Sequence, residues 1–224
     1  MSFDPLFTRF VDGFRQFHAT WYEGGHNLYK ELRAGQKPVA VVVACSDSRV
    51  DPVQILNARP GELFVIRNVA NLVPPHEPDT HHHGVSSALE YAIRHLRVRH
   101  IIVMGHAHCG GFANLLGGGH EQDVFLNVWL DQAQLAKREA ERLPPSVGPE
   151  ARQRACEMNG VRISLRNLRT FPWIEQALAK NRLHLHGLYF DMSAGELLCL
   201  DPESDMFIPL EETLRGARAA ADGG

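Results

Sequence analysis

Residues 100–111 read His-Ile-Ile-Val-Met-Gly-His-Ala-His-Cys-Gly-Gly, a buried-strand pattern followed at once by candidate metal ligands. The apolar run over residues 101–104 has no polar alternation, so it predicts a strand covered on both faces, as in a parallel sheet. The glycines on either side of the ligand motif permit tight turns. We therefore expect His106 and Cys109 to lie just past the carboxyl end of this strand.

A second stretch has the same construction. Residues 39–44, Val-Ala-Val-Val-Val-Ala, predict another strand buried on both faces, and Cys45 comes directly after it. Functional groups in an open parallel sheet collect at the carboxyl ends of the strands, so Cys45 converges with His106 and Cys109 if the two strands are neighbours. Two thiolates and one imidazole suit Zn²⁺, and three protein ligands leave a fourth position for water, as in catalytic zinc sites.

Asp47 and Arg49 stand at alternate positions after Cys45, beside this candidate zinc site. A carboxylate that accepts a hydrogen bond from zinc-bound hydroxide would orient it for attack. Such a carboxylate tends to become a ligand itself, and a bidentate pair with an arginine would hold it off the metal. The alternative interpretation is a turn-forming aspartate and a solvated arginine.

The remaining patterns predict an α/β fold, with a mainly parallel central sheet, an antiparallel edge strand and flanking helices. Strands are expected over residues 39–44, 63–66, 100–104, 183–190 and 196–200. Helices are expected over residues 52–56, 87–96 (capped by Ser86), 112–116, 124–142, 150–168 and 173–180. No linker or internal repeat is present, so residues 1–224 are expected to form one domain, with a frayed tail after residue 216.

An N-terminal helical arm is expected over about residues 1–34. Its apolar residues recur at spacings of three and four, which is typical of an amphipathic helix, and Gly24-Gly25 is expected to interrupt it. The apolar stripe is unusually aromatic and consists of Phe7, Phe10, Val11, Phe14, Phe17 and Trp21. This stripe packs either on the chain's own core or on another subunit.

Charge and composition argue against several classes of partner. The formal net charge is −3 and no basic stripe stands out, so nucleic acid and anionic membranes are not expected partners. The first residues lack the apolar core of a signal peptide, and no apolar stretch approaches the ~20 residues that span a bilayer. A cytoplasmic protein is therefore expected.

Other cysteines and histidines receive ordinary structural roles. Disulfides are not expected in a reducing compartment, and Cys156 and Cys199 have no partner at ligand spacing, so both are interpreted as packing residues. The adjacent His81, His82 and His83 would point to alternate faces of an extended chain, so they are not expected to converge on one metal ion.

The two ligand motifs, over residues 44–50 and 105–111, closely resemble those of the β-class carbonic anhydrases. Residues 60–71, 87–92 and 186–189 extend the resemblance, which covers roughly residues 28–200. The resemblance implies reversible hydration of carbon dioxide to bicarbonate and a proton. It also implies one Zn²⁺ per chain on Cys45, His106 and Cys109, with Asp47 and Arg49 as a catalytic dyad.

The resemblance further implies a narrow apolar pocket for carbon dioxide at a dimer interface. The matching positions are Gln36, Phe64, Val69, Tyr91 and Gly110. The expected assembly is a homodimer or a dimer of dimers, with the N-terminal arm exchanged between subunits. This favours the interpretation in which the aromatic stripe packs on a partner.

Some bacterial members of the resembled family bind bicarbonate at a regulatory site made of a Trp, an Arg and a Tyr. The matching positions here are Val42, Arg67 and Phe190, so only the arginine is present and no such site is expected.

His108 is interpreted as a surface residue, with a proton shuttle as the alternative. Two other functions stay open: a zinc hydrolase of another small heterocumulene such as carbon disulfide, and a non-catalytic zinc or redox protein.

Overall fold

The computed structural model describes residues 4–23, 28–79 and 81–213. One six-stranded sheet has the order β2-β1-β3-β4-β5-β6. Its strands are β1 (Ala40–Cys45), β2 (Leu63–Asn68), β3 (His100–His106), β4 (His184–Asp191), β5 (Glu196–Leu200) and β6 (Phe207–Pro209). The first four strands pair in parallel, and β5 runs antiparallel to β4. The predicted α/β class is confirmed, and the short strand β6, which was not predicted, pairs with the outer side of β5.

Helices connect these strands and cover the sheet. The α-helices are α1 (Pro5–His18), α2 (Leu28–Leu32), α3 (Pro52–Ile55), α4 (Gly84–Glu90), α5 (Gly110–Leu116), α6 (Val124–Asp131), α7 (Gln134–Glu141), α8 (Gly148–Leu168) and α9 (Pro172–Ala179). Four further turns of helix are η1 (Ala19–Glu23), η2 (Val69–Asn71), η3 (Tyr91–His95) and η4 (Pro145–Val147). None of the helices in the described part of the chain is long and apolar enough to cross a membrane.

The prediction of a single helix over residues 124–142 is wrong, because the structure has two helices there, α6 and α7. Ala133 leaves the helical conformation, with φ −100° and ψ 10°, and separates α6 from α7. Leu130, Ala133 and Ala136 are all buried in one apolar cluster with Cys109. The break therefore lets two short helices present their apolar residues to the same core.

The cap predicted at Ser86 is also wrong. Helix α4 begins earlier, at Gly84, with His83 in the capping position. The carbonyl of His83 accepts the hydrogen bond of the Ser87 amide at 2.9 Å, which continues the helical pattern back through Ser86. Asp79 accepts hydrogen bonds from the rings of His81 and His83 at 3.1 and 2.6 Å, so the preceding loop is organised around one carboxylate.

Strands β1 and β3 form the rigid centre of the sheet. Alternate residues of β1 enter different clusters: Val41 and Val43 pack towards α4, α8 and α9, whereas Val42 and Ala44 pack with Met104 on the other face. All six residues of β1 are buried, which confirms the prediction for residues 40–44, whereas Val39 precedes the strand and is 54% exposed. A strand held from both faces fixes the position of the loop that leaves its carboxyl end.

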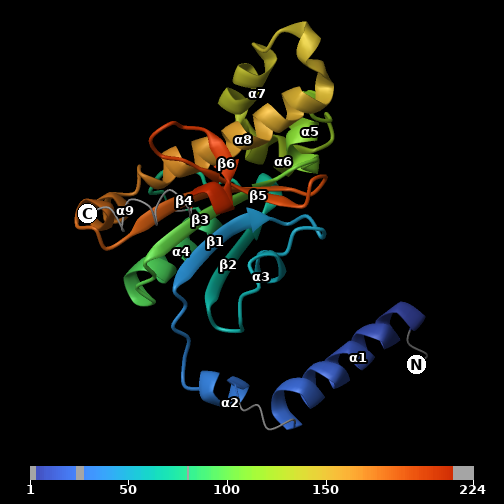
Figure 1. The fold of residues 1–224 in the computed structure, drawn as a ribbon, viewed down its shortest axis with the longest axis vertical. Helices are drawn as coiled ribbons and strands as arrows, with labels where there is room; N and C mark the ends of the chain where they lie inside the picture. Colours follow the sequence, from blue (N-terminus) through green and yellow to red (C-terminus); the bar gives the residue numbers. More distant parts are fainter. Residues whose placement is uncertain (1–3, 24–27, 80, 214–224) are drawn as a thin grey trace.

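Helices α1 and α2 stand apart from the sheet (Figure 1). Helix α1 buries none of its residues, and Phe10 and Phe14 are 58% and 63% exposed. The ring centroids of Phe17, near the end of α1, and Tyr29, in α2, lie 5.1 Å apart, so this contact links the two helices. Packing of the aromatic stripe on the chain's own core is thus not seen in the described residues. The predicted break at Gly24-Gly25 and the tail after residue 216 lie outside those residues.

Candidate metal centre

Cys45, His106 and Cys109 come together at the carboxyl ends of β1 and β3. The strands are parallel neighbours with Ala44 opposite Met104, so Cys45 and His106 leave the sheet at the same edge. Cys109 precedes α5. The three side chains are buried, their donor atoms all lie within 4.8 Å of one another, and no other trio in the described residues meets that condition. The convergence predicted from two strand ends is therefore present.

The imidazole of His106 is oriented as a ligand. Its Nδ1 lies 2.9 Å from the carbonyl oxygen of Ala107. Because a carbonyl only accepts, Nδ1 carries the hydrogen and Nε2 keeps a lone pair. That Nε2 is buried and has no hydrogen-bond partner among the described residues. A buried ring nitrogen without a partner, beside two sulfurs, is the arrangement expected of a metal ligand.

The two thiols perturb each other's pKa in opposite directions. The sulfurs of Cys45 and Cys109 lie 3.9 Å apart. The Cys109 thiol lowers the pKa of Cys45 to about 4 by hydrogen bonding to its sulfur, and the pKa of Cys109 is raised by the same contact and by burial. Burial acts to lower the pKa of His106, but Cys45, the Ala107 carbonyl and the charge of Asp47 together raise that pKa. A bound cation would replace the remaining proton, so this Cys₂His set fits zinc.

Asp47 and Arg49 form a bidentate pair beside these ligands. Nε and Nη2 of Arg49 donate to Oδ1 and Oδ2 of Asp47 at 3.0 and 2.7 Å, and the Arg49 amide donates to Oδ1 at 2.9 Å. The hydrogen bonds from Arg49 hold the pKa of the Asp47 carboxyl well below its usual range. Asp47 therefore remains an ionised acceptor.

Arg67 supports the loop after β1, a role that was not predicted. It donates to the carbonyls of Cys45, Asp47 and Val50 at 3.0, 2.6 and 3.1 Å. The register of β1 against β2, with Ala44 opposite Arg67, brings it there. The signal in the sequence was the position of Arg67 directly after the strand expected over residues 63–66, because parallel neighbours end at the same edge of a sheet.

Glu157 lies beneath Cys109 and was also missed. Its Oε1 accepts hydrogen bonds from the Cys109 amide at 2.8 Å and from Gln153 at 2.9 Å, and its Oε2 accepts one from the Tyr189 hydroxyl at 2.6 Å. Burial raises the pKa of Glu157, and those hydrogen bonds oppose the rise. The network fixes the backbone of a ligand, but no local motif indicates a contact 48 residues away.

The predicted substrate residues lie in three places. Val69 and Gly110 are beside the ligands, since Gly110 comes directly after Cys109 and Val69 borders Gly111. Phe64, near the amino-terminal end of β2, and Tyr91, at the start of η3, form a pair whose ring centroids are 6.0 Å apart. Gln36 is exposed and precedes β1, at the opposite end of that strand from Cys45. One chain therefore does not gather all five positions at the ligands.

The remaining candidates have structural partners. His108 is exposed and shares a hydrogen bond of 3.0 Å with the hydroxyl of Ser193. Cys156 is fully buried in the apolar cluster around Cys109, and burial raises its pKa to about 12. Cys199 is half-buried beside the cluster of Met104, on the other face of the sheet.

Comparison with known sequences bears directly on this centre. The carbonic anhydrase family model matches residues 40–197, which include every ligand. The chain is 36% identical over 191 residues to beta carbonic anhydrase 3 of Arabidopsis thaliana, covering 84% of this chain and 74% of that protein. It is 38% identical over 203 residues to a carbonic anhydrase of Pseudomonas aeruginosa, covering 90% of this chain and 91% of that protein.

Solved structures share the fold as well. The β-carbonic anhydrase CcaA superposes with a TM-score of 0.86 at 31% identity, over 92% of each chain. A tetrameric β-carbonic anhydrase of Sordaria macrospora superposes with a TM-score of 0.77 at 29% identity, over 88% of this chain and 98% of that one. The agreement in sequence, sheet and ligand motifs leads to one conclusion: this chain belongs to the β-class carbonic anhydrases, a family of lyases.

Proposed function

We propose that this protein binds one zinc ion per chain through Cys45, His106 and Cys109 and catalyses the reversible hydration of carbon dioxide to bicarbonate and a proton. The observation that carries the proposal is the buried, unpartnered Nε2 of His106 beside two thiols, in a carbonic anhydrase chain. When bound, zinc supplies a Lewis acid that lowers the pKa of water and so provides a nucleophile at neutral pH.

Asp47 orients the attacking water. Its Oδ1 accepts two hydrogen bonds from Arg49, whereas its Oδ2 accepts one. An ionised carboxylate has about four acceptor positions, so Oδ2 keeps room for a further donor. The low pKa of Asp47 keeps this acceptor available across the neutral range. A fixed acceptor directs the lone pair of the water towards carbon dioxide.

Arg49 keeps that carboxylate in place. Its Nη2 donates to the carbonyl of His108 at 3.1 Å as well as to Asp47. The guanidinium therefore ties the loop after β1 to the loop after β3. A bidentate pair resists rotation of the carboxylate towards the ligand sulfurs, which a single hydrogen bond would not do.

A dimer interface completes the pocket for carbon dioxide in this proposal. Carbon dioxide is small and has no net charge, so it requires an apolar surface next to the nucleophile. Val69 and Tyr91 offer such a surface and are 37% and 45% exposed in the single chain. The exposed rings of Phe10 and Phe14 on α1 and the tetrameric relatives in Sordaria macrospora support a homodimer or a dimer of dimers.

The proposal includes no bicarbonate regulation through Val42, Arg67 and Phe190. The guanidinium of Arg67 is already committed to three backbone carbonyls. Val42 is fully buried in an apolar cluster and Phe190 packs in another. The cytoplasmic location expected from the sequence also remains part of the proposal.

Stopped-flow measurement of substrate turnover tests the assignment. The zinc-loaded protein is expected to hydrate carbon dioxide and to leave carbon disulfide unchanged. Turnover of carbon disulfide without carbon dioxide hydration would favour the heterocumulene hydrolase. Absence of both activities in protein that holds one zinc per chain would favour a non-catalytic zinc protein.

A further inference from the structure

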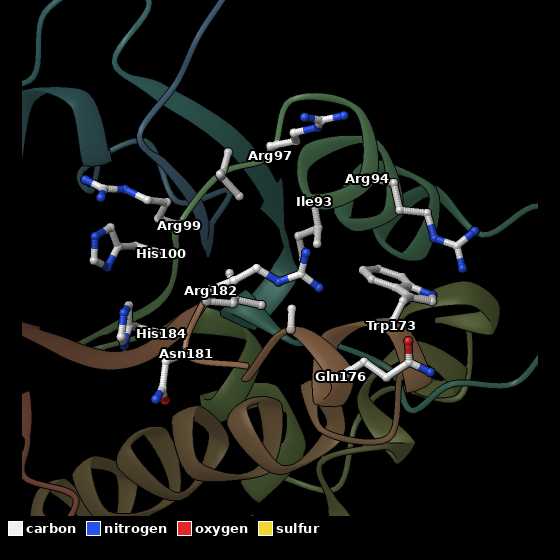
Figure 2. A pocket seen from close by; sticks show the side chains of 13 residues that line it. Ile93, Arg94, Arg97, Arg99, His100, Trp173, Gln176, Asn181, Arg182 and His184 are labelled. Atoms are coloured by element: carbon white, nitrogen blue, oxygen red, sulfur yellow. The ribbon is translucent and has the colours of Figure 1, made fainter. Parts of the chain in front are cut away.

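A large cavity lies at the edge of the sheet opposite the metal centre. Its volume is about 890 Å³. It is bounded by η3, by α9 and by the amino-terminal ends of β3 and β4 (Figure 2). The candidate zinc ligands lie at the carboxyl ends of β1 and β3. Small-molecule sites typically occupy ~300–1,000 Å³, so the cavity has the size of a ligand site.

The lining of this cavity is strongly cationic. It includes Arg94, Arg97, Arg99 and Arg182, together with His100 and His184, and it contains no aspartate or glutamate. Arg94 pairs with Glu90 at 3.2 Å. The described residues offer no ion pair to the other three arginines. Three exposed arginines without an ion pair, all lining one concavity, create a positive potential that attracts anions.

The backbones that carry these arginines are held by hydrogen bonds. The Arg99 carbonyl accepts from the His184 amide at 2.9 Å, which joins β3 to β4, and the Arg182 amide donates to Ala177 at 3.0 Å. Arg97 has a positive φ of 56° in the turn between η3 and β3. These backbones therefore lie on two segments, the turn before β3 for Arg97 and Arg99 and the turn before β4 for Arg182. Multipoint recognition of a ligand requires such an arrangement.

Figure 2 shows how the side chains are distributed. Arg182 extends across the middle of the cavity, with Arg97 at one rim. Arg99 lies on the side of the two histidines, and Arg94 lies on the side of Trp173. The Arg94 guanidinium carbon stands 5.6 Å from the centroid of the Trp173 ring. The Arg182 guanidinium therefore lies nearest the middle of the space, whereas those of Arg99 and Arg94 point outward on opposite sides of it.

We propose that this cavity binds a small polyanion that carries at least two phosphate groups. A guanidinium fork matches two phosphate oxygens, and several forks around one space require a ligand with more than one anionic group. Phosphate carries more charge per group than carboxylate, which suits three unpaired arginines. The concave shape and the net charge of −3 favour a small molecule over a nucleic acid. The proposal does not depend on the carbonic anhydrase reaction.

Isothermal titration calorimetry with inorganic tripolyphosphate on the zinc-loaded protein tests this site. One saturable site per chain is expected, with citrate binding more weakly and affinity falling as salt is raised. The double variant Arg97→Asn/Arg182→Gln should weaken binding by at least about tenfold. Asparagine tolerates the positive φ at position 97. Any tripolyphosphate bound at the zinc centre persists in this variant, so the difference reports the cavity alone.

Arg138→Gln, an exposed arginine on α7 far from the cavity, is the matched control and should bind like the wild type. Circular dichroism checks that the double variant is folded, and the single variant Arg182→Gln replaces it if it is not. Three results would overturn the proposal: no saturable binding, equal loss in Arg138→Gln, or wild-type affinity in the folded cavity variant. Citrate that binds more tightly than tripolyphosphate would overturn the phosphate assignment.

Discussion

Arg49 donates hydrogen bonds to both carboxylate oxygens of Asp47, from Nε to Oδ1 at 3.0 Å and from Nη2 to Oδ2 at 2.7 Å. The Asp47 side chain is 16% exposed, whereas that of Arg49 is 53% exposed, so the arginine closes the solvent side of the pair. Because Arg49 also reaches the His108 carbonyl, the pair connects the two loops that carry the candidate ligands.

Replacing the carboxylate tests its proposed role. Asp47→Asn keeps the shape of the side chain but halves its acceptor capacity, so it should lower kcat for carbon dioxide hydration by about 10²–10⁴-fold. Zinc content should stay at one per chain, since Asp47 is not a proposed ligand. Asp131→Asn, at the exposed end of α6, is the control and should keep full activity. An unchanged rate in Asp47→Asn would remove Asp47 from the mechanism.

A methyl group at position 110 tests the proposed pocket wall. A Cβ built on Gly110 meets no atom within 4 Å, so Gly110→Ala should fold and bind zinc normally. The added group should nevertheless obstruct carbon dioxide and lower kcat/KM by about tenfold. Gly84→Ala, at the start of α4, also has free space around its Cβ and serves as the control for stopped-flow kinetics. Equal kcat/KM for Gly110→Ala and the wild type would contradict this placement.

The exposed aromatic stripe of α1 should be buried by a second subunit. Phe10→Asp/Phe14→Asp is therefore expected to reduce the mass in size-exclusion chromatography with light scattering to that of a monomer. Activity should fall as well, because we propose that the pocket is completed in the dimer. Gln16→Asp adds a charge to the polar face of the same helix and should leave the assembly intact. A wild-type mass for the double phenylalanine variant would show that the arm does not hold subunits together.

Asp191 should stabilise the fold in a pH-dependent way. It accepts hydrogen bonds from Arg154 and from the amides of Ser193 and Ala194, and the Arg154 contact is the main reason that its pKa is lowered. A lowered folded-state pKa contributes stability that is fully present above the unfolded value of about 4 and is lost as pH falls through the folded value.

Asp191→Asn should therefore lower the free energy of unfolding in urea by about 1–3 kcal/mol at pH 7, and the deficit should shrink near pH 3. Asp205→Asn alters a surface pair with Arg162, whose aspartate is 72% exposed, and should cost little at either pH. A deficit for Asp191→Asn that is the same at both pH values would contradict the role assigned to its charge.

The sequence predicted the parts of the fold that depend on local pattern. Unbroken β-branched runs marked β1 and β3 as strands buried on both faces, and a ligand motif after each indicated where they meet. Cys45, His106 and Cys109 could be grouped because neighbouring parallel strands end at the same edge. The geometry of Asp47 with Arg49 also agreed with their close spacing.

Features that depend on tertiary packing were not predicted. Glu157 comes after Cys156 in an ordinary helical sequence, and only the placement of α8 against β3 brings its carboxylate under Cys109. The break at Ala133 results from two short helices packing on a shared core, not from a helix-breaking residue. The resemblance predicts Gln36 in the pocket, but one chain places it at the far end of β1, so that prediction depends on the proposed second subunit.

We propose that zinc on Cys45, His106 and Cys109 drives carbon dioxide hydration. The most direct test measures zinc content and hydration rate on the same samples as zinc is removed by a chelator and then restored. The rate should fall and recover in proportion to zinc, up to one ion per chain, in the wild type and in the Cys199→Ser control. His106→Ala should lose both zinc and activity. Full activity in zinc-free protein, or a zinc-loaded wild type that does not hydrate carbon dioxide, would contradict the account.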